Sequence, residues 1–442
     1  MESSEYDIVI IGAGILGTSL AYMFSGFSEY RVLLVEREHE AALHSSSRNT
    51  GVLHRPFYLD PAKKKVFAKA AQFSYPLWKE LSAKYNLPWS QNGTVEVAVR
   101  EADVETLQKY EQYAAANGME PDEFALLSQE ELKGIEPLVK SKGAFYSKTD
   151  TGVSFGQYAR KLLEISIAKG LSIKFDTAVE TVLANESKLI LRNRDGKEKT
   201  VRYGALVNVA GSGAVHLARK FGLAKIYAVL HFRGDYWRVS DSLRGRIRRN
   251  IYSVPRHSKY PFLDPHFVIR HDGKMEIGPN AALVWGPYGY LRGDPNRRLS
   301  DIDLFARPLM PKLKLFTNME FMSMVRQEWK SSTHRDAMIG RISQFVNGLK
   351  PGDITGRGLS GIRHSLIDSS GFVPEAVMEI GGSSLHVMNY NSPGATGAPA
   401  YAAHLIGKML DAGLISEKRI KAENEGDILW GSAFSKLLEN MT

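Results

Sequence analysis

The start of the sequence constrains the fold most, because an apolar run, three spaced glycines and a helical pattern follow one another there. Residues 7–11 are apolar after the first position, and Gly12, Gly14 and Gly17 come next in the spacing G-x-G-x-x-G. This order predicts a buried strand, a tight turn and a helix over residues 15–25. Glycine is needed at the turn, at the approach to a pyrophosphate, and where the helix packs on the strand.

Residues 31–35, which are apolar after Arg31, predict a second parallel strand, and Glu36 follows it roughly 20 residues beyond the glycines. A carboxylate at that place accepts hydrogen bonds from ribose hydroxyls and repels a 2′-phosphate. The positive end of the helix dipole favours phosphates at the glycine turn. Together these features predict a dinucleotide site that disfavours NADP, rather than a plain structural turn.

Length and cysteine content restrict the chemistry. A chain of 442 residues is too long for one hydrophobic core and suits two connected domains. The absence of cysteine excludes disulfides, thiolate metal sites, thiol nucleophiles and a cysteinyl-flavin linkage. Redox chemistry would then need a bound cofactor, and no metal site is expected. No apolar run is long enough to span a bilayer and no leader precedes Tyr6, so we expect a cytoplasmic protein.

The net charge of +9 and the pI of about 9.3 are compatible with nucleic acid, an anionic membrane or a small anionic substrate. Basic residues are spread along the chain, with one cluster at residues 244–249. The sequence has no helix-turn-helix, zinc-finger or aromatic-basic signature. We therefore expect a small anionic substrate and no nucleic-acid partner.

The remaining patterns predict an α/β protein, α+β overall, with a Rossmann-like nucleotide-binding domain and an antiparallel-sheet substrate or cap domain. The segments 87–142 and 226–340 are assigned to the cap domain, because they lack glycine loops and the second has many aromatics. The nucleotide-binding domain is discontinuous and comprises residues 1–86, 143–225 and 341–415.

Residues 416–442 form a predicted helical tail. Trp430, Phe434, Leu437 and Leu438 fall at positions i, i+4, i+7 and i+8, which gives an amphipathic helix. Its apolar face would pack on the body of the protein or on a membrane surface. We favour packing on the body, and keep peripheral contact with the inner face of the cell membrane as the alternative.

Five stretches of the chain resemble the FAD-dependent oxidoreductases of the D-amino-acid-oxidase type: residues 12–17 with Glu36, 47–54, 232–236, 278–281 and 392–396. Within that group the chain is most similar to the L-2-hydroxyglutarate oxidases and dehydrogenases, through 47–54 and 278–281. A secondary likeness, through 153–156 and 392–395, is to the malate:quinone oxidoreductases.

The resemblance implies non-covalent FAD and oxidation of L-2-hydroxyglutarate, a 2-hydroxy dicarboxylic acid, to the 2-oxo acid by hydride transfer to flavin N5. Electrons would pass to a quinone or to oxygen. Oxidation of malate is the first alternative, and oxidation of an amine or amino acid of the sarcosine or glycine type is the second. The basic pI leaves a non-catalytic or tRNA-modifying flavoprotein as a further class.

Oxidising a 2-hydroxy acid needs a base for the hydroxyl proton and a cation for the carboxylate. With the resemblance, His54 is the candidate base, since a neutral imidazole can take a proton near pH 7. Arg363 is the candidate for the carboxylate, which a guanidinium can hold in two parallel hydrogen bonds. Arg270 and His231 are weaker candidates for a second carboxylate. The expected cofactor contacts are Gly12, Gly14, Ile15, Leu16, Gly17, Glu36, Arg37, Ser46, Ser47, Asn49, Thr50, Gly51, Val179, Ala210, Gly211, Arg363, Pro393, Gly394, Ala395 and Thr396.

Overall fold

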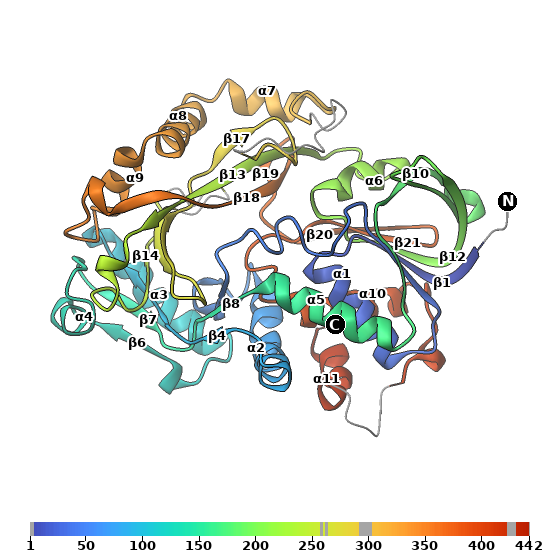
Figure 1. Ribbon diagram of the computed structural model, residues 1–442, viewed down its shortest axis with the longest axis horizontal. Helices are drawn as coiled ribbons and strands as arrows, with labels where there is room; N and C mark the ends of the chain where they lie inside the picture. Colours follow the sequence, from blue (N-terminus) through green and yellow to red (C-terminus); the bar gives the residue numbers. More distant parts are fainter. Residues whose placement is uncertain (1–3, 257–259, 261–263, 291–302, 422–429, 442) are drawn as a thin grey trace.

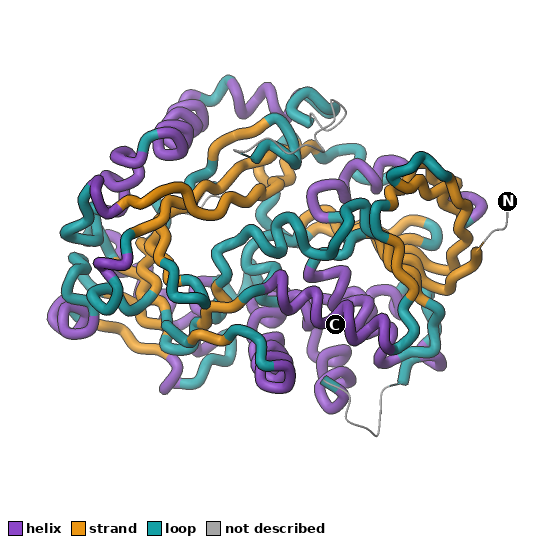
Figure 2. The backbone as a smooth tube through the Cα atoms, viewed as in Figure 1, coloured by secondary structure: helices purple, strands orange, loops and turns teal. Residues whose placement is uncertain are grey.

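A computed structural model describes residues 4–256, 260, 264–290, 303–421 and 430–441. The chain folds into two large sheets with helices packed against them, so the predicted mixed α/β class is confirmed (Figures 1 and 2). Among the described residues, no helix is both long and apolar enough to span a lipid bilayer.

The eight-stranded sheet includes the strand that leads into the glycine turn. Its central strands run in the order β10-β11-β12-β1-β2-β9, and β21 pairs with β12 and β20. The pairs β12–β1, β1–β2, β2–β9 and β12–β21 are parallel, while β10–β11, β11–β12 and β20–β21 are antiparallel. Its strands are β1 (Ser4–Ile11), β2 (Val32–Val35), β9 (Ser172–Lys174), β10 (Thr177–Leu183), β11 (Lys188–Asn193), β12 (Glu198–Asn208), β20 (Val377–Gly381) and β21 (Ser384–Asn389).

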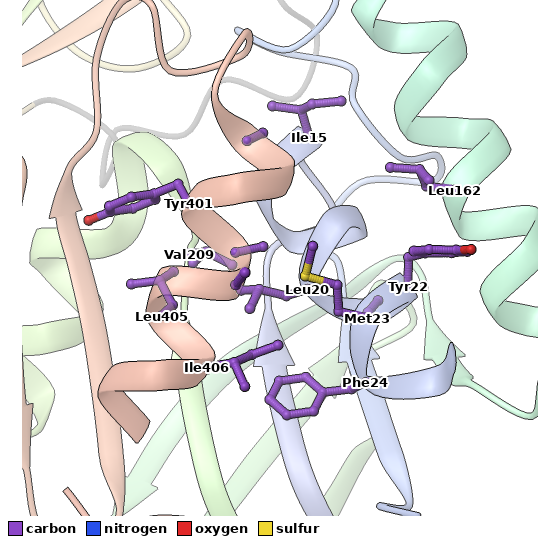
Figure 3. Close-up of a cluster of buried hydrophobic side chains, with 14 of the residues drawn as sticks. Ile15, Leu20, Tyr22, Met23, Phe24, Leu162, Val209, Tyr401, Leu405 and Ile406 are labelled. Carbon is purple, nitrogen blue, oxygen red and sulfur yellow. The ribbon is translucent and has the colours of Figure 1, made fainter. Parts of the chain in front are cut away.

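The helices on one face of this sheet share its largest hydrophobic cluster. They are α1 (Ile15–Phe27), α2 (Lys65–Tyr85), α5 (Phe155–Ala168), α10 (Ala398–Asp411) and α11 (Gly431–Met441). Figure 3 shows Leu20 and Met23 of α1 between Leu162 of α5 and Leu405 of α10. A second junction between a strand and a glycine turn follows β12, at Gly211–Gly213, and leads into helix α6 (Ala214–Lys220). The predicted strand, turn and helix at residues 7–25 are therefore confirmed.

The ten-stranded sheet has the order β19-β18-β13-β16-β15-β14-β5-β7-β6, with β17 paired to β13. It is antiparallel apart from the parallel pair β5–β14. Its strands are β5 (Thr94–Val97), β6 (Phe124–Leu127), β7 (Ala144–Ser147), β13 (Ala228–Val239), β14 (Asn250–Ser253), β15 (His266–Ile269), β16 (Met275–Gly278), β17 (Ala282–Val284), β18 (Ile354–Asp368) and β19 (Gly371–Phe372).

Helices α3 (Glu101–Ala116), α4 (Gln129–Ile135), α7 (Met310–Phe316), α8 (Met319–Thr333) and α9 (Arg335–Ile342) surround the ten-stranded sheet (Figure 1). A small three-stranded sheet of β3 (Val52–Leu53), β8 (Thr151–Val153) and β4 (Trp89–Ser90) lies where the chain passes between the two large sheets. We keep the division into two domains as a proposal. Strands β7 and β18 both belong to the ten-stranded sheet, where β7 pairs with β5 and β6 and β18 pairs with β13 and β19, although their residues lie within the ranges assigned to the nucleotide-binding domain.

The tail packs on the body of the protein. Trp430, Phe434 and Leu437 are almost fully buried, and the Phe434 ring stacks on Phe27 of α1 with centroids 4.5 Å apart. The indole N–H of Trp430 donates to the carbonyl of Leu77 at 2.9 Å. The packing interpretation is thus confirmed, and the apolar face of this helix is not free for a membrane.

Candidate active site

A cavity of about 510 Å³ extends from the carboxyl ends of β1 and β2 to strand β18 and the loop before α10. Ligand sites of open α/β sheets lie at this edge. Most of the predicted cofactor contacts line it, namely Gly12, Gly14, Ile15, Leu16, Glu36, Arg37, Ser46, Asn49, Thr50, Gly51, Val179, Ala210, Gly211, Arg363, Pro393, Gly394, Ala395 and Thr396.

The glycines of the first turn are required by close backbone contacts. Gly12 has φ +107°, and a Cβ there would lie 2.7 Å from the carbonyl oxygen of Val209. A Cβ at Gly17 would lie 1.8 Å from the carbonyl oxygen of Gly12, so the helix can approach the strand only through glycine. Gly17 does not line the cavity, and its contribution is therefore to packing.

Glu36 is fixed at the end of β2 by two backbone donors. Its Oε2 accepts from the N–H of Ala13 at 2.8 Å, and its Oε1 accepts from the N–H of Glu38 at 3.0 Å. Burial raises the pKa of this carboxyl group, which the neighbouring Glu38 also raises. The carboxyl group lies at the cavity wall beside the glycine turn, where a ribose would be held.

Hydrogen bonds within the polar loop 44–54, and one between this loop and α1, hold the loop in place at the cavity. The Asn49 amide donates to the carbonyls of Ser45 and Ser46 at 2.9 and 3.0 Å, and its Oδ1 accepts from the N–H of Gly51 at 2.8 Å. The Ser46 hydroxyl accepts from the N–H of Ile15 at the start of α1, at 3.0 Å.

Two predicted residues have packing or bracing contacts instead of cavity contacts. The Ser47 hydroxyl is buried against Gly156, where a Cβ would lie 2.0 Å from it, and has no hydrogen-bond partner among the described residues. The Arg270 guanidinium donates to the carbonyls of Asn49, at 2.6 Å, and Thr50, and forms an ion pair with Glu276 at 2.6 Å. Arg270 therefore supports the loop 44–54 from outside the cavity.

His231 also lies outside the cavity wall. Its Nε2 lies 2.9 Å from Oδ2 of Asp303. Carboxylates of this chain thus pair with both Arg270 and His231. No cation is therefore assigned to a second carboxylate of the substrate.

Arg363 lies on β18 in the cavity wall. No carboxylate oxygen of the described residues lies within 4.0 Å of its guanidinium, and its Nε has no hydrogen-bond partner there. Burial lowers the pKa of Arg363 to about 10, so the group remains a cation at neutral pH. A buried cation with an unused donor indicates a site for an anion.

His54 is the other predicted catalytic residue that lines the cavity. Its Nδ1 lies 2.9 Å from Oδ2 of Asp150, and its backbone N–H donates to Oγ1 of Thr396 at 3.2 Å. The carbonyl of Thr396 accepts from the indole N–H of Trp78 at 2.8 Å. The structure therefore joins the loop 44–54 to the loop before α10, which are far apart in the sequence.

Sequence reasoning missed Asp150 and the position of Tyr236, whose hydroxyl lies 2.8 Å from Oγ1 of Thr50. Asp150 sits in a polar turn between two short strands, and its contact with His54 spans 96 positions. Neither residue carries a local pattern for its contact, so only the folded structure could reveal it.

The cavity residues fit FAD. The glycine turn, Glu36 and the second junction at Ala210 and Gly211 provide a cradle for the phosphates and ribose of a dinucleotide. The same cavity is lined at its other end by His54, Arg363 and the loop before α10. Nucleotide binding and redox chemistry can therefore occur within one continuous space.

Comparisons with known proteins agree with this fit. Residues 7–408 match the family model described as "FAD dependent oxidoreductase". L-2-hydroxyglutarate dehydrogenase of Caenorhabditis briggsae, a mitochondrial protein, is 29% identical and the match covers 91% of this chain and 92% of that protein. The protein of the same name from Salmonella houtenae is 26% identical, with 91% and 93% covered, and the human mitochondrial one is 27% identical, with 90% and 87% covered.

Solved structures share the fold. L-alpha-glycerophosphate oxidase from Mycoplasma pneumoniae, solved with FAD bound, superposes with a TM-score of 0.65 at 21% identity, with 91% of this chain and 93% of that chain covered. Glycine oxidase from Geobacillus kaustophilus gives a TM-score of 0.66 at 17% identity, with 94% and 96% covered. The expected FAD-binding architecture is confirmed.

Proposed function

Since this chain belongs to the FAD dependent oxidoreductase family, we propose that it oxidises L-2-hydroxyglutarate to the corresponding 2-oxo acid. FAD, when bound, supplies the acceptor for the hydride that leaves the substrate. The chain's own side chains have two tasks, which are to hold the substrate's carboxylate and to take up the proton of its hydroxyl group.

The single observation that carries the proposal is that Arg363 and His54 line one cavity and that Arg363 has no counter-ion among the described residues. A planar guanidinium can hold the carboxylate next to the hydroxyl-bearing carbon through two parallel hydrogen bonds. This contact fixes both the position and the orientation of the reacting carbon, which is a large part of what binding can contribute to rate.

His54 is the proposed base. Its Nδ1 is engaged by Asp150, and its Nε2 has no hydrogen-bond partner among the described residues. A lone pair on Nε2 can therefore accept the hydroxyl proton of a substrate held by Arg363. As the O–H bond breaks, its electron pair forms the C=O bond of the 2-oxo acid, and the C–H bond of the same carbon breaks with its electron pair leaving as the hydride.

The choice of L-2-hydroxyglutarate over malate is supported by the names of the matched relatives. Malate remains the alternative because residues 153–156 and 392–395 resemble the malate enzymes. An amine or amino acid is the alternative outside the hydroxy acids.

Anaerobic mixing of the FAD-loaded protein with each acid tests the proposal. We expect L-2-hydroxyglutarate to bleach the flavin absorbance near about 450 nm faster than malate, glycine or sarcosine at equal concentration. Bleaching by glycine or sarcosine, with release of ammonia or methylamine, would instead support the alternative that the protein oxidises an amine. Absence of bleaching by every hydroxy acid would refute it.

We also propose a quinone as the electron acceptor, with oxygen as the alternative, and a membrane surface as the place of contact. An exposed apolar surface supports contact with a membrane. We call it the α7 face, and it consists of Phe305, Leu309, Met310, Leu313 and Met319. Met310 and Met319 are 74% and 86% exposed. Helices α7 and α8 form an outer edge of the molecule (Figure 1).

The charges around the α7 face fit an anionic lipid bilayer. Exposed residues between 305 and 330 include Arg307, Lys314, Arg326 and Lys330 but only one carboxylate, Glu320. Apolar side chains flanked by cations are typical of helices that lie in the headgroup region. The proposed location is therefore peripheral, on a membrane that carries the quinone.

A further inference from the structure

Asp150 is a fully buried carboxylate held in one position by three donors. Its Oδ1 accepts from the N–H of Arg55 at 2.9 Å and from the hydroxyl of Ser147 at 2.7 Å. Its Oδ2 lies 2.9 Å from Nδ1 of His54, whose side chain is 13% exposed. Because the other two donors fix the carboxylate, it can in turn fix the imidazole.

This contact decides which nitrogen of His54 carries the proton. A carboxylate only accepts hydrogen bonds, so Nδ1 must carry a hydrogen and donate it to Asp150. In the neutral ring the lone pair is then on Nε2, the nitrogen left for the cavity that His54 lines. The structure thus presents the nitrogen that a substrate hydroxyl can reach as a proton acceptor.

Two phenols, an imidazole and a carboxyl group close to the His54–Asp150 pair are neutral near pH 7. The rings of Tyr58 and Tyr252 meet the imidazole edge-on, with centroids 6.0 and 5.6 Å away, and burial raises the pKa of both phenols. Burial lowers the pKa of His266, which stacks on Tyr252. Burial also raises the pKa of Glu96, a carboxyl group near Asp150, to about 8.

Two charged groups of this wall therefore act on a protonated His54. Asp150 contacts the ring directly and favours the imidazolium. Arg363, on β18, is a cation that a bound substrate carboxylate would neutralise. Once the Asp150 charge is removed, no anion among the described residues of this wall faces the imidazolium.

We propose that Asp150 is a positioning residue, which holds His54 with Nε2 toward the cavity and stabilises the imidazolium formed when Nε2 takes a proton. The proton moves from the substrate oxygen to Nε2, and Asp150 keeps its charge throughout. The identity of the proton donor rests on the proposed function, while the orientation and charge coupling of His54 do not.

A substrate-free measurement tests the orientation. The holoenzyme is labelled with 15N-histidine, the ring signals of His54 are assigned by their absence in H54Q, and their 15N shifts report which ring nitrogen carries the hydrogen. In the native protein we expect Nδ1 to carry it, and in D150N we expect most rings to carry it on Nε2 instead, because the amide that replaces the carboxylate can donate to Nδ1. D7N, at a carboxylate of β1 that pairs with Arg419, is the control and is expected to leave the position of the hydrogen unchanged.

A kinetic cycle tests whether Asp150 acts through His54. With L-2-hydroxyglutarate, we expect H54Q and D150N each to slow flavin reduction by on the order of 10²–10⁴-fold. The double variant H54Q/D150N is expected to be no slower than H54Q, because Asp150 has no target once His54 is gone. A merely structural Asp150 would slow the reaction further in the H54Q background.

The outcomes separate this proposal from the proposed function. If Nδ1 of His54 still carries the hydrogen in D150N, the role of Asp150 is overturned, whatever the substrate. A hydrogen moved to Nε2 in D150N, without flavin reduction by any hydroxy acid in the native protein, would keep the role of Asp150 and refute the substrate. If D150N does not retain FAD, D150E serves instead, because it keeps the charge but displaces it. Reduction is then expected to slow while Nδ1 of His54 keeps its hydrogen, and an unchanged reduction rate would overturn the proposal.

Discussion

At the scale of single residues, Arg363 determines the proposed substrate recognition. Replacement by lysine keeps the charge but removes the planar pair of donors. Losing one hydrogen bond to a charged group is worth about 1.5–3 kcal/mol, so R363K is expected to raise KM for L-2-hydroxyglutarate by roughly ten- to a hundredfold. Steady-state assays measure this, with R357K as the matched control.

Arg357 lies on the same strand, outside the cavity wall, with its guanidinium 3.6 Å from the centroid of the Trp237 ring. R357K is expected to leave KM unchanged. An unchanged KM in R363K, or an equal rise in both variants, would contradict the assignment of the carboxylate to Arg363.

Glu96 makes the stability of the protein depend on pH. Burial raises its pKa from 4.5 to about 8, so the folded state keeps a proton that the unfolded state has released between these values. The unfolded state binds fewer protons in this window, and the free energy of unfolding therefore falls as the pH rises from about 4.5 to about 8. E96Q mimics the protonated form and is expected to flatten this decline. Urea unfolding at pH 5, 6.5 and 8 measures the free energy of unfolding of the native protein and of E96Q. An equally steep decline with pH in the two proteins would refute the argument.

The sequence could predict that a residue lies at the cavity where a local pattern marks it. His54 ends the polar loop and Arg363 comes two residues after Gly361, and both line the cavity, while their roles stay predictions. Arg270 shows the limit of this reasoning, since an arginine after an apolar strand does not reveal that Glu276 will face it across the hairpin. Asp150 shows the same limit, because its partner His54 lies 96 positions earlier in the chain, just after β3.

At the scale of elements, helix α1 depends on how closely it approaches β1. In G17A the new Cβ would lie 1.8 Å from the carbonyl oxygen of Gly12, so the helix must move away and the phosphate turn must open. We expect G17A to lose FAD on gel filtration and to melt at a lower temperature.

Gly26 of the same helix is the matched control, because a Cβ there meets nothing within 4 Å. G26A is expected to keep FAD and to be more stable by about 0.5–1 kcal/mol, the helix preference of alanine over glycine. A G17A variant that retained FAD as G26A does would show that the approach of α1 to β1 is dispensable.

The strand-turn-helix unit was predictable because its signals are local, but strand β18 was not. Its sequence contains three glycines, which disfavour a strand. The structure gives the reason for two of them: a Cβ at Gly361 would lie 1.7 Å from the carbonyl oxygen of Arg48, and one at Gly358 would lie 2.5 Å from Oε1 of Glu276. Glycine at these two positions allows close contact with the loop 44–54 and with β16. No local pattern can indicate such contacts.

At the scale of the whole molecule, the two sheets meet at the loop 44–54. The Ser45 hydroxyl donates to the carbonyl of Ile362 on β18 at 2.9 Å, and Thr50 contacts Tyr236 of β13. Residues 12–37 carry the local signals of the nucleotide end of the cavity, to which Val179, Ala210 and Gly211 are added from later in the chain. The other end is assembled entirely from segments that carry no such signal. This difference explains why the cofactor was predictable in more detail than the substrate.

The α7 face gives a prediction for the molecule as a whole. We expect the native protein to sediment with phosphatidylglycerol vesicles and not with phosphatidylcholine vesicles, because burial of apolar side chains and attraction to anionic lipids act together. Replacing Met310 and Leu313 in M310E/L313E removes apolar area and adds repulsion from the lipids, so binding is expected to be lost at unchanged flavin content. I226E is the control, because Ile226 is 64% exposed but lies outside the α7 face. Equal sedimentation of M310E/L313E and I226E would show that another surface, or none, meets the membrane. Reduction of a membrane quinone would then have to occur without contact between α7 and the lipids.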